Sequence, residues 1–111
     1  MRYALPRLKN EAIGDMRVIT HRRITEAMKR HTDCVTALDQ WYRVMKKAHL
    51  ADFAEMRHLF NSVDKVDDVY VFNVGGNKLR IIAAVHFNTG KVFIREVLTH
   101  REYDKGHWRT K

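Results

Sequence analysis

The fold is decided by the stretch VYVFNVGGNKLRIIAAVHFNTGKVFIREVL, which runs from Val69 to Leu98. Aromatic and β-branched residues dominate it, as they do in β-strands. Two turn signals, Gly75-Gly76-Asn77 and Asn88-Thr89-Gly90-Lys91, divide it into strand-length pieces. The stretch therefore predicts a meander of three antiparallel strands. The predicted strands cover residues 69–72, 79–87 and 92–98.

Side chains alternate between the two faces of a strand, so the long middle strand separates an apolar face from a mixed face. In the register that the second turn suggests, Phe87 pairs with Val92. Ala84 then lies opposite Arg95, and the side chains of Arg80 and Arg95 both emerge on the less apolar face. The residues predicted to face the core are Leu79, Ile81, Ala83, Val85 and Phe87.

The residues before the meander follow a helical period. Thr20 is placed to cap a first helix with its hydroxyl, and Thr32-Asp33 offers a cap for a second helix. Asp52 caps a shorter third helix that ends at Asn61-Ser62, and Val18-Ile19 is a candidate edge strand. The recurring apolar positions are Ile24, Ala27, Met28 and His31, then Val35, Leu38, Trp41 or Tyr42 and Met45, then Phe53, Met56 and Leu59 or Phe60.

Helices followed by strands are typical of the α+β class. We therefore expect two to three N-terminal helices packed on one face of a small antiparallel sheet. The chain has 111 residues, about the length of one domain. Residues 1–15 are weakly patterned and contain Pro6; they are either an arm that packs on the body or sequence upstream of a natural start at Met16. The expected organisation is an N-terminal extension or arm over 1–15 and a single domain over 16–111.

The charge of the chain favours polyanionic partners. Lys and Arg number 21 against 13 Asp and Glu, a formal net charge of +8. Ribosomal proteins, nucleases and membrane-surface binders can all carry such a charge. Cys34 is the only cysteine, and the histidines lack a convincing zinc-ligand spacing, so we expect no disulfide, metal or cofactor. No apolar run is long enough to span a bilayer, which favours a cytoplasmic protein without a membrane partner.

The residues from Thr99 to Arg109 include many groups that donate, accept or stack. Cleavage of RNA by its own 2′-hydroxyl requires a base, an acid for the leaving oxygen and cations around the phosphate. Histidine, glutamate, tyrosine and arginine supply these groups without a metal. Ordinary structural roles compete with this interpretation, because Arg80 and Arg95 would serve equally as solvated strand residues and Tyr103 as a packing residue.

Two runs, Val71 to Arg80 (VFNVGGNKLR) and Thr99 to Asp104 (THREYD), resemble the HigB branch of the RelE-like toxins. The resemblance extends from about Met16 to about Lys105. It implies a RelE-like microbial ribonuclease fold and an mRNA interferase, the toxin of a type II toxin–antitoxin system. Such toxins cut mRNA, typically on the ribosome, and are silenced by a helix-turn-helix antitoxin. The resemblance therefore implies mRNA, the ribosome and a HigA-like antitoxin as partners.

The resemblance also implies roles for single residues. Arg80 matches the arginine that RelE-like toxins place in a central strand against the scissile phosphate. His100 matches the basic or imidazole position just after the last strand. Tyr103 falls near the C-terminal aromatic residue of these toxins, where it would either donate a proton or stack on a base. The full set of candidates is Arg80, His100, Tyr103, Arg95 and Glu102 for catalysis, and Lys78, Arg101 and Lys105 for RNA binding.

Two alternative functions stay open at the level of the sequence. A non-catalytic RNA- or ribosome-binding module needs only the basic charge and the aromatic tail. A nuclease that acts independently of the ribosome would use the same residues on naked RNA. The assignment of base and acid among the catalytic candidates also stays open.

Overall fold

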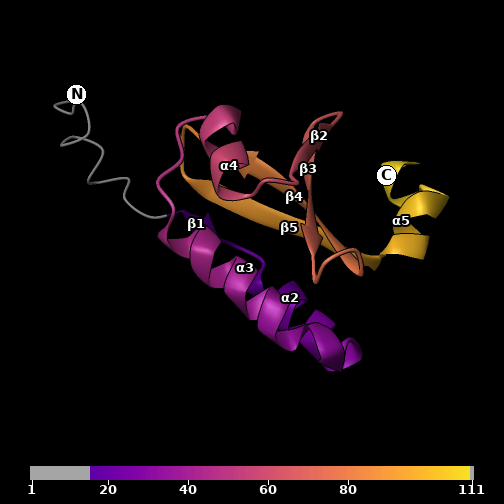
Figure 1. The fold of residues 1–111 in the computed structure, drawn as a ribbon. Coiled ribbons are helices and arrows are strands. Elements are labelled where there is room, and N and C mark those ends of the chain that lie inside the picture. Colours follow the sequence, from indigo (N-terminus) through magenta and orange to yellow (C-terminus); the bar gives the residue numbers. More distant parts are fainter. Residues whose placement is uncertain (1–15, 111) are drawn as a thin grey trace, which may run out of the picture.

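The computed structural model describes residues 16–110 and confirms the α+β class (Figure 1). Helices α2 and α3 lie along one face of a twisted sheet, and α5 follows the last strand at one end of it. The helices are α2 (His21–Arg30), α3 (Val35–Lys47), α4 (Phe53–Leu59) and α5 (His100–Lys105), with 3₁₀ turns at Thr32–Cys34 and His107–Thr110. The strands are β1 (Arg17–Val18), β2 (Asp64–Val66), β3 (Val69–Val74), β4 (Leu79–His86) and β5 (Lys91–Thr99).

The predicted meander is confirmed as the antiparallel strands β3, β4 and β5. Its predicted register is wrong, because Val85 rather than Phe87 pairs with Val92. The last cross-strand pair before the turn is His86 with Lys91, so the loop contains the four residues between them instead of residues 88–91. Such a loop length is common in hairpins, and the sequence alone did not distinguish the two frames.

A bulge in β5 also changes the position of Arg95 relative to β4. Ile82 pairs with Glu96 and Ala83 pairs with Ile94, which leaves Arg95 as the extra residue of β5. Ala84 therefore lies opposite Phe93, and not opposite Arg95 as predicted.

Short strands extend the sheet at both edges, in the order β1-β5-β4-β3-β2. β2 is antiparallel to β3, whereas β1 is parallel to β5, so the sheet is mixed rather than purely antiparallel. The backbone N–H groups of Arg17 and Ile19 donate to the carbonyls of Gly90 and Val92, at 2.7 and 2.8 Å. The predicted edge strand is therefore present, but it begins one residue earlier than Val18.

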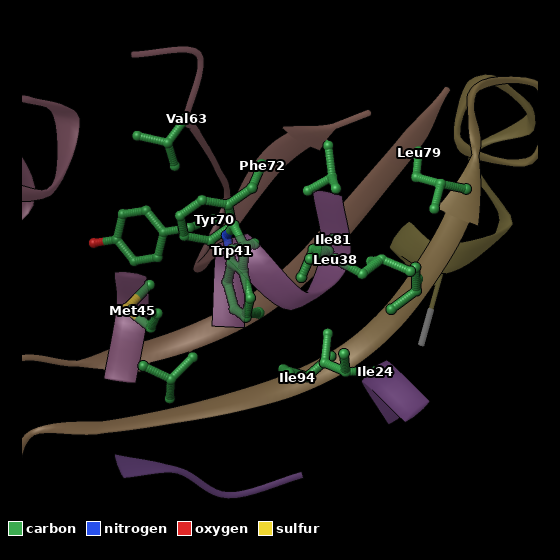
Figure 2. Packing of buried hydrophobic residues seen from close by; sticks show 14 of the residues in the cluster. Ile24, Leu38, Trp41, Met45, Val63, Tyr70, Phe72, Leu79, Ile81 and Ile94 are labelled. Atoms are coloured by element: carbon green, nitrogen blue, oxygen red, sulfur yellow. The ribbon is translucent and has the colours of Figure 1, made fainter. Parts of the chain in front are cut away.

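The main core lies between the helices and the sheet face predicted to be apolar (Figure 2). Leu79, Ile81 and Ala83 of β4 are fully buried there, against Ile24 of α2 and Leu38 of α3. Aromatic side chains fill the centre of the core. The Trp41 and Phe72 rings meet edge to face with centroids 5.2 Å apart. Each fully buried Leu or Ile side chain contributes about 1.5–3 kcal/mol to the free energy of unfolding.

The opposite sheet face carries a second, smaller cluster that the sequence indicated only as a partly open face. Val69, Val71 and Ile82 are buried in it. Tyr103 and Trp108 pack against these residues and are themselves partly exposed. The C-terminal segment therefore shields part of the face on which Arg80 lies.

Two of the predicted helix caps have different outcomes. Asp52 caps α4 as predicted, because its Oδ1 accepts the Glu55 N–H at 2.9 Å. Thr20 precedes α2, but its hydroxyl makes no cap. Instead, Thr20 Oγ1 accepts the Ile94 N–H at 2.6 Å and donates to the Ile94 carbonyl at 2.8 Å. The bulge at Arg95 leaves the N–H and carbonyl of Ile94 available. By bonding to both, Thr20 links the start of α2 to β5.

Helix α5 was not predicted, and the helices are therefore not all N-terminal. Thr99 and Glu102 form a capping box: the Thr99 hydroxyl accepts the Glu102 N–H at 3.1 Å, and Glu102 Oε1 accepts the Thr99 N–H at 2.9 Å. Gly106 ends the helix in the left-handed region at φ 76°. The expected N-terminal arm, residues 1–15, lies outside the described residues. Among residues 16–110, no helix is long and apolar enough to cross a membrane.

Replacing Thr20 tests its bonds to β5. Thr20→Val should lower the free energy of unfolding by about 1–3 kcal/mol, because it leaves the Ile94 N–H and carbonyl without these partners. Thr25→Val is the matched control, since the Thr25 hydroxyl donates only to the exposed Arg22 carbonyl. Urea denaturation of both variants measures the difference, and equal losses would contradict the fastening role of Thr20.

Alanine substitutions in the Gly75-Gly76 turn test how tightly this turn packs on the helical layer. Both glycines have positive φ, so alanine at either should cost about 1–2 kcal/mol. Only at Gly75 would the new Cβ meet a close neighbour, Cys34 Sγ at 3.1 Å, and Gly76 has nothing within 4 Å. Gly75→Ala should therefore be the more destabilising in urea denaturation. In a Cys34→Ala background, the two penalties should become similar.

Candidate functional site

The site is centred on Arg80, a cation on the sheet face opposite the main core. Its side chain is only 7% exposed. Nη1 donates to the carbonyls of Asn77 and Leu79, both at 3.3 Å, and Nη2 donates to Asn77 Oδ1 at 3.0 Å. Nη2 also lies 2.9 Å from His100 Nδ1. These partners are all polar and uncharged in this geometry, and Arg80 forms no ion pair with any residue of the described chain. A buried guanidinium with hydrogen bonds but without a counter-ion is suited to an anion.

The turn before β4 and the helix after β5 bring these groups together. β4 begins beside the end of β5, with Leu79 paired to Thr99. The His100 N–H then donates to the Lys78 carbonyl at 3.1 Å, which joins the start of α5 to the start of β4. The capping box of α5 fixes the direction in which the helix leaves the sheet. The His100 ring is placed at Arg80 by these backbone constraints.

His100 also contacts a carboxylate on its own helix. Its Nε2 lies 3.3 Å from Asp104 Oδ2, one helical turn further on. Arginine has only donor groups, so the 2.9 Å contact with Arg80 requires an unprotonated Nδ1 on His100. The neutral ring then carries its proton on Nε2, which faces Asp104. Both side chains are about half exposed to solvent, so the pair is accessible to a substrate.

Aromatic rings continue the site along the second sheet face. The Arg80 guanidinium lies 5.6 Å from the centroid of the Tyr103 ring. Tyr103 stacks on Trp108 with centroids 5.1 Å apart and an interplanar angle of 17°. Arg109 lies 5.6 Å from the Trp108 ring centroid and pairs with Asp67 at 3.5 Å. The Trp108 Nε1 donates to the Tyr103 carbonyl at 3.0 Å, which holds the 3₁₀ turn against α5.

Clefts flank the aromatic pair. One has a volume of about 320 Å³ and lies between β5, α5 and the last 3₁₀ turn. Its lining residues are Glu96, Leu98, Glu102, Lys105, His107 and Trp108. A smaller cleft of about 80 Å³ lies beside Trp108 and includes Arg95 and Ile82. The larger cleft adjoins the position of Arg80, because Leu98 is the cross-strand partner of Arg80. A flexible, single-stranded ligand bound at Arg80 would therefore have room for a neighbouring group.

The structure brings three of the predicted catalytic residues together: Arg80, His100 and Tyr103. Arg95 lies on the same sheet face but in the bulge, at the smaller cleft. Glu102 was a candidate base, yet its carboxylate caps α5, and the Thr99 N–H lowers its pKa. A carboxylate with a lowered pKa is a weaker base, so Glu102 fits helix capping better than proton transfer.

The predicted RNA-binding residues are more dispersed. The Lys78 ammonium pairs with Asp33 at 3.0 Å, which raises the pKa of Lys78 and lowers that of Asp33. Lys78 is nevertheless exposed beside the site. Arg101 is exposed at the start of α5, and Lys105 lines the larger cleft. All three are therefore accessible to solvent, but the structure does not gather them around Arg80.

Three site residues were missed from the sequence: Asn77, Asp104 and Trp108. Asn77 was assigned to the turn alone, although it lies three residues before Arg80 and its side chain reaches back to the guanidinium. Asp104 lies four residues after His100, a helical spacing that was missed because α5 was interpreted as an irregular tail. Trp108 lies beyond Gly106 in the last 3₁₀ turn, and no spacing in the sequence indicated its contact with Tyr103. Within residues 16–110, no group of three or more His, Cys, Asp or Glu side chains is arranged to hold a metal ion.

Comparison with known proteins identifies the relatives of this chain. Residues 34–106 match the family described as HigB toxin, the RelE-like toxic component of a toxin–antitoxin system. The chain is 37% identical over 92 residues to the mRNA interferase toxin HigB of Escherichia coli K12, covering 80% of this chain and 88% of that protein. It is 33% identical over 93 residues to the mRNA interferase HigB of Escherichia coli O6:H1, covering 81% and 90%.

The matched region contains Arg80, His100 and Tyr103, and it ends just before Trp108. Both the extent of this match and the identity to the relatives are sufficient to assign the family. The α+β fold agrees with it. The chain belongs to the HigB family of RelE-like toxins.

Proposed function

We propose that this chain is an mRNA interferase, an endoribonuclease that inhibits translation and growth by cutting mRNA. Its relatives in Escherichia coli are named mRNA interferases, which supports the activity. The observation that carries the proposal is the buried guanidinium of Arg80, which has no carboxylate partner in the described chain and contacts an imidazole. A phosphodiester of RNA supplies the missing negative charge, and the 2′-hydroxyl of the adjoining ribose supplies a proton for the imidazole.

In the proposed reaction, Arg80 binds the non-bridging oxygens of the scissile phosphate. His100 Nδ1 takes the proton of the 2′-hydroxyl, and the 2′-oxygen attacks phosphorus. The bond from phosphorus to the 5′-oxygen breaks, which leaves a 2′,3′-cyclic phosphate and a 5′-hydroxyl. The leaving oxygen departs on the opposite side of phosphorus from the attacking oxygen, so its proton comes from another group. The Tyr103 hydroxyl is our candidate for this donor, and the phenolate that it leaves takes up a proton from solvent once the products have left.

The remaining basic residues of the site contribute positive potential. Lys78 lies two residues before Arg80, Arg101 follows His100, and Lys105 lines the larger cleft. None of the three enters the hydrogen-bond network of the guanidinium. We assign them to contacts with the flanking phosphates of RNA, and Arg95 to a phosphate further along the sheet face. Each phosphate neutralised in this way adds close to one unit to the salt dependence of binding.

We further propose that the ribosome presents the message in the cytoplasm and that a HigA-like helix-turn-helix antitoxin silences the toxin. Membership of a toxin–antitoxin family supports an antitoxin partner. Support for the ribosome comes from the net charge of +8 and from exposed cations on α2 and α3. These cations are Arg22, Arg23, Lys29, Arg30, Lys46 and Lys47. Residues 16–111 would act as one toxin domain.

Substitution of the two central residues tests the proposed activity. Arg80→Lys should lower cleavage by at least about 100-fold, because lysine does not replace the planar set of donors of the buried guanidinium. His100→Gln should lower it by at least about 100-fold as well, because general acid–base groups contribute roughly 10²- to 10⁴-fold. Inducible expression followed by mapping of message ends measures this. The parent chain should create new internal 5′ ends, and both variants should lose them while keeping the circular dichroism spectrum of the parent.

Arg43→Lys is the matched control, since Arg43 pairs with Asp39 on the exposed side of α3, away from the site. It should cleave like the parent chain. Growth arrest by the parent chain without any new message ends would instead support a non-catalytic RNA- or ribosome-binding module. Cleavage of purified naked RNA at the same rate would show that the ribosome is not required.

A second pair of variants separates two roles of Tyr103. Tyr103→Phe keeps the ring between Arg80 and Trp108 but removes the hydroxyl, whereas Tyr103→Leu removes both. If the hydroxyl protonates the leaving oxygen, both variants should lose roughly 10²-fold or more in single-turnover cleavage. A normal rate for Tyr103→Phe with a slow Tyr103→Leu would assign Tyr103 to stacking alone, which is worth about 1–3 kcal/mol per base.

A further inference from the structure

Asp104 has no role in the activity proposed above, yet it is in contact with the central histidine. We propose that Asp104 is a positioning residue that holds His100 in the tautomer with its proton on Nε2, so that unprotonated Nδ1 faces Arg80 and the substrate. The proposal rests on the proposed function of His100 and goes beyond it by assigning a task to a second residue of α5.

Two contacts with charged side chains support one orientation of the His100 ring. Nδ1 lies 2.9 Å from Arg80 Nη2, and Nε2 lies 3.3 Å from Asp104 Oδ2. Arginine only donates and an ionised carboxylate only accepts. The neutral ring satisfies both contacts in one tautomer alone. A ring without Asp104 would keep only the Arg80 contact, and that contact is lost when a phosphate draws the guanidinium away.

The position of Asp104 in α5 supports this role. Asp104 lies four residues after His100, the spacing that places two side chains on one helix face. An acidic residue near the C-terminal end of a helix is unfavourable for the helix dipole, and aspartate is a poor helix former. Helix stability therefore does not explain Asp104, whereas its contact with His100 does.

The other charged groups around His100 are already engaged. Lys78 offers its carbonyl to the His100 N–H, and its ammonium is held by Asp33. Glu102 accepts the Thr99 N–H and interacts with Arg30 and His31 from the end of α2. Arg80 contacts His100 from β4, and the Tyr103 ring of α5 lies against the Arg80 guanidinium. Within the described chain, Asp104 supplies the carboxylate in contact with the imidazole.

Asp104 would also act after the proton transfer. When Nδ1 takes the proton of the 2′-hydroxyl, His100 becomes a cation close to the cation of Arg80. The carboxylate of Asp104, 3.3 Å from Nε2, then offsets the new charge on the ring. The proton remains on His100 until the cyclic phosphate has left and returns to solvent, so Asp104 itself neither gains nor loses a proton.

Asp104→Ala and Asp104→Asn test the proposal, with Asp39→Ala as the matched control. Asp39 also pairs with a basic residue four positions away, on the exposed side of α3. Asp104→Ala should lower kcat for cleavage about ten-fold or more with little change in KM, the lower end of what residues that orient a working histidine contribute. Asp104→Asn keeps an acceptor for Nε2–H but lacks the charge, so it should recover part of the rate. Asp39→Ala should match the parent chain.

The tautomer gives a readout that does not depend on activity. ¹⁵N spectra of histidine-labelled protein distinguish protonated from unprotonated ring nitrogens, and His100→Gln identifies the signals of His100. The spectra are recorded with a non-cleavable 2′-deoxy oligonucleotide bound, so that a phosphate takes the guanidinium of Arg80 from the ring. The parent chain should then still show His100 with Nε2 protonated, and Asp104→Ala should show a mixture of tautomers. An unchanged tautomer or an unchanged rate in Asp104→Ala would overturn the proposal. If the parent chain cleaves no RNA, the proposed function fails, while the spectra still decide whether Asp104 orients the ring.

Discussion

The burial of the Arg80 guanidinium beside uncharged partners is the constraint around which the second face of the sheet is organised. A buried charge is costly unless its donors are satisfied, and here the turn before β4 and the helix after β5 both supply acceptors. The turn can do so because Asn77 lies three residues before Arg80. The helix can do so because β5 ends beside the start of β4 and the His100 N–H bonds to the Lys78 carbonyl. The site thus lies where one strand begins and its neighbour ends.

The main core stabilises this arrangement, although its side chains lie on the sheet face opposite the site. Alternation along β4 directs Leu79, Ile81 and Ala83 into the layer covered by α2 and α3, and directs Arg80 and Ile82 to the other side. Thr20 joins the start of α2 to β5 at the bulge, and the turn before β4 packs on Cys34 at Gly75. The helical layer therefore holds the strands in a fixed register, and that register sets the position of Arg80 relative to His100.

How well the sequence predicted each feature depends on whether neighbouring residues determine that feature or contacts between distant segments do. Strand alternation and the cap at Asp52 depend on neighbouring residues, and both were predicted correctly. The hairpin frame and the bulge at Arg95 depend on contacts between strands, which a single sequence leaves undetermined. Helix α5 is a different case, because Thr99 and Glu102 carry a local capping signal that was overlooked in favour of catalytic chemistry. The pattern from Thr99 to Glu102 is compatible both with a capping box and with acid–base chemistry, and the geometry favours capping for Glu102.

The contacts of Arg80 in the free protein also bear on how a substrate would enter. Asn77 and His100 occupy positions around the guanidinium that phosphate oxygens would need, and the Tyr103 ring lies over it. A phosphate is the stronger acceptor for a guanidinium, since charge-assisted bonds are roughly twice as strong as neutral ones. Its arrival would exchange the bond to His100 for an ionic one and so release Nδ1 to accept a proton. Phosphate binding and activation of the base would then be a single event, which ties the chemistry of His100 to the presence of a bound backbone.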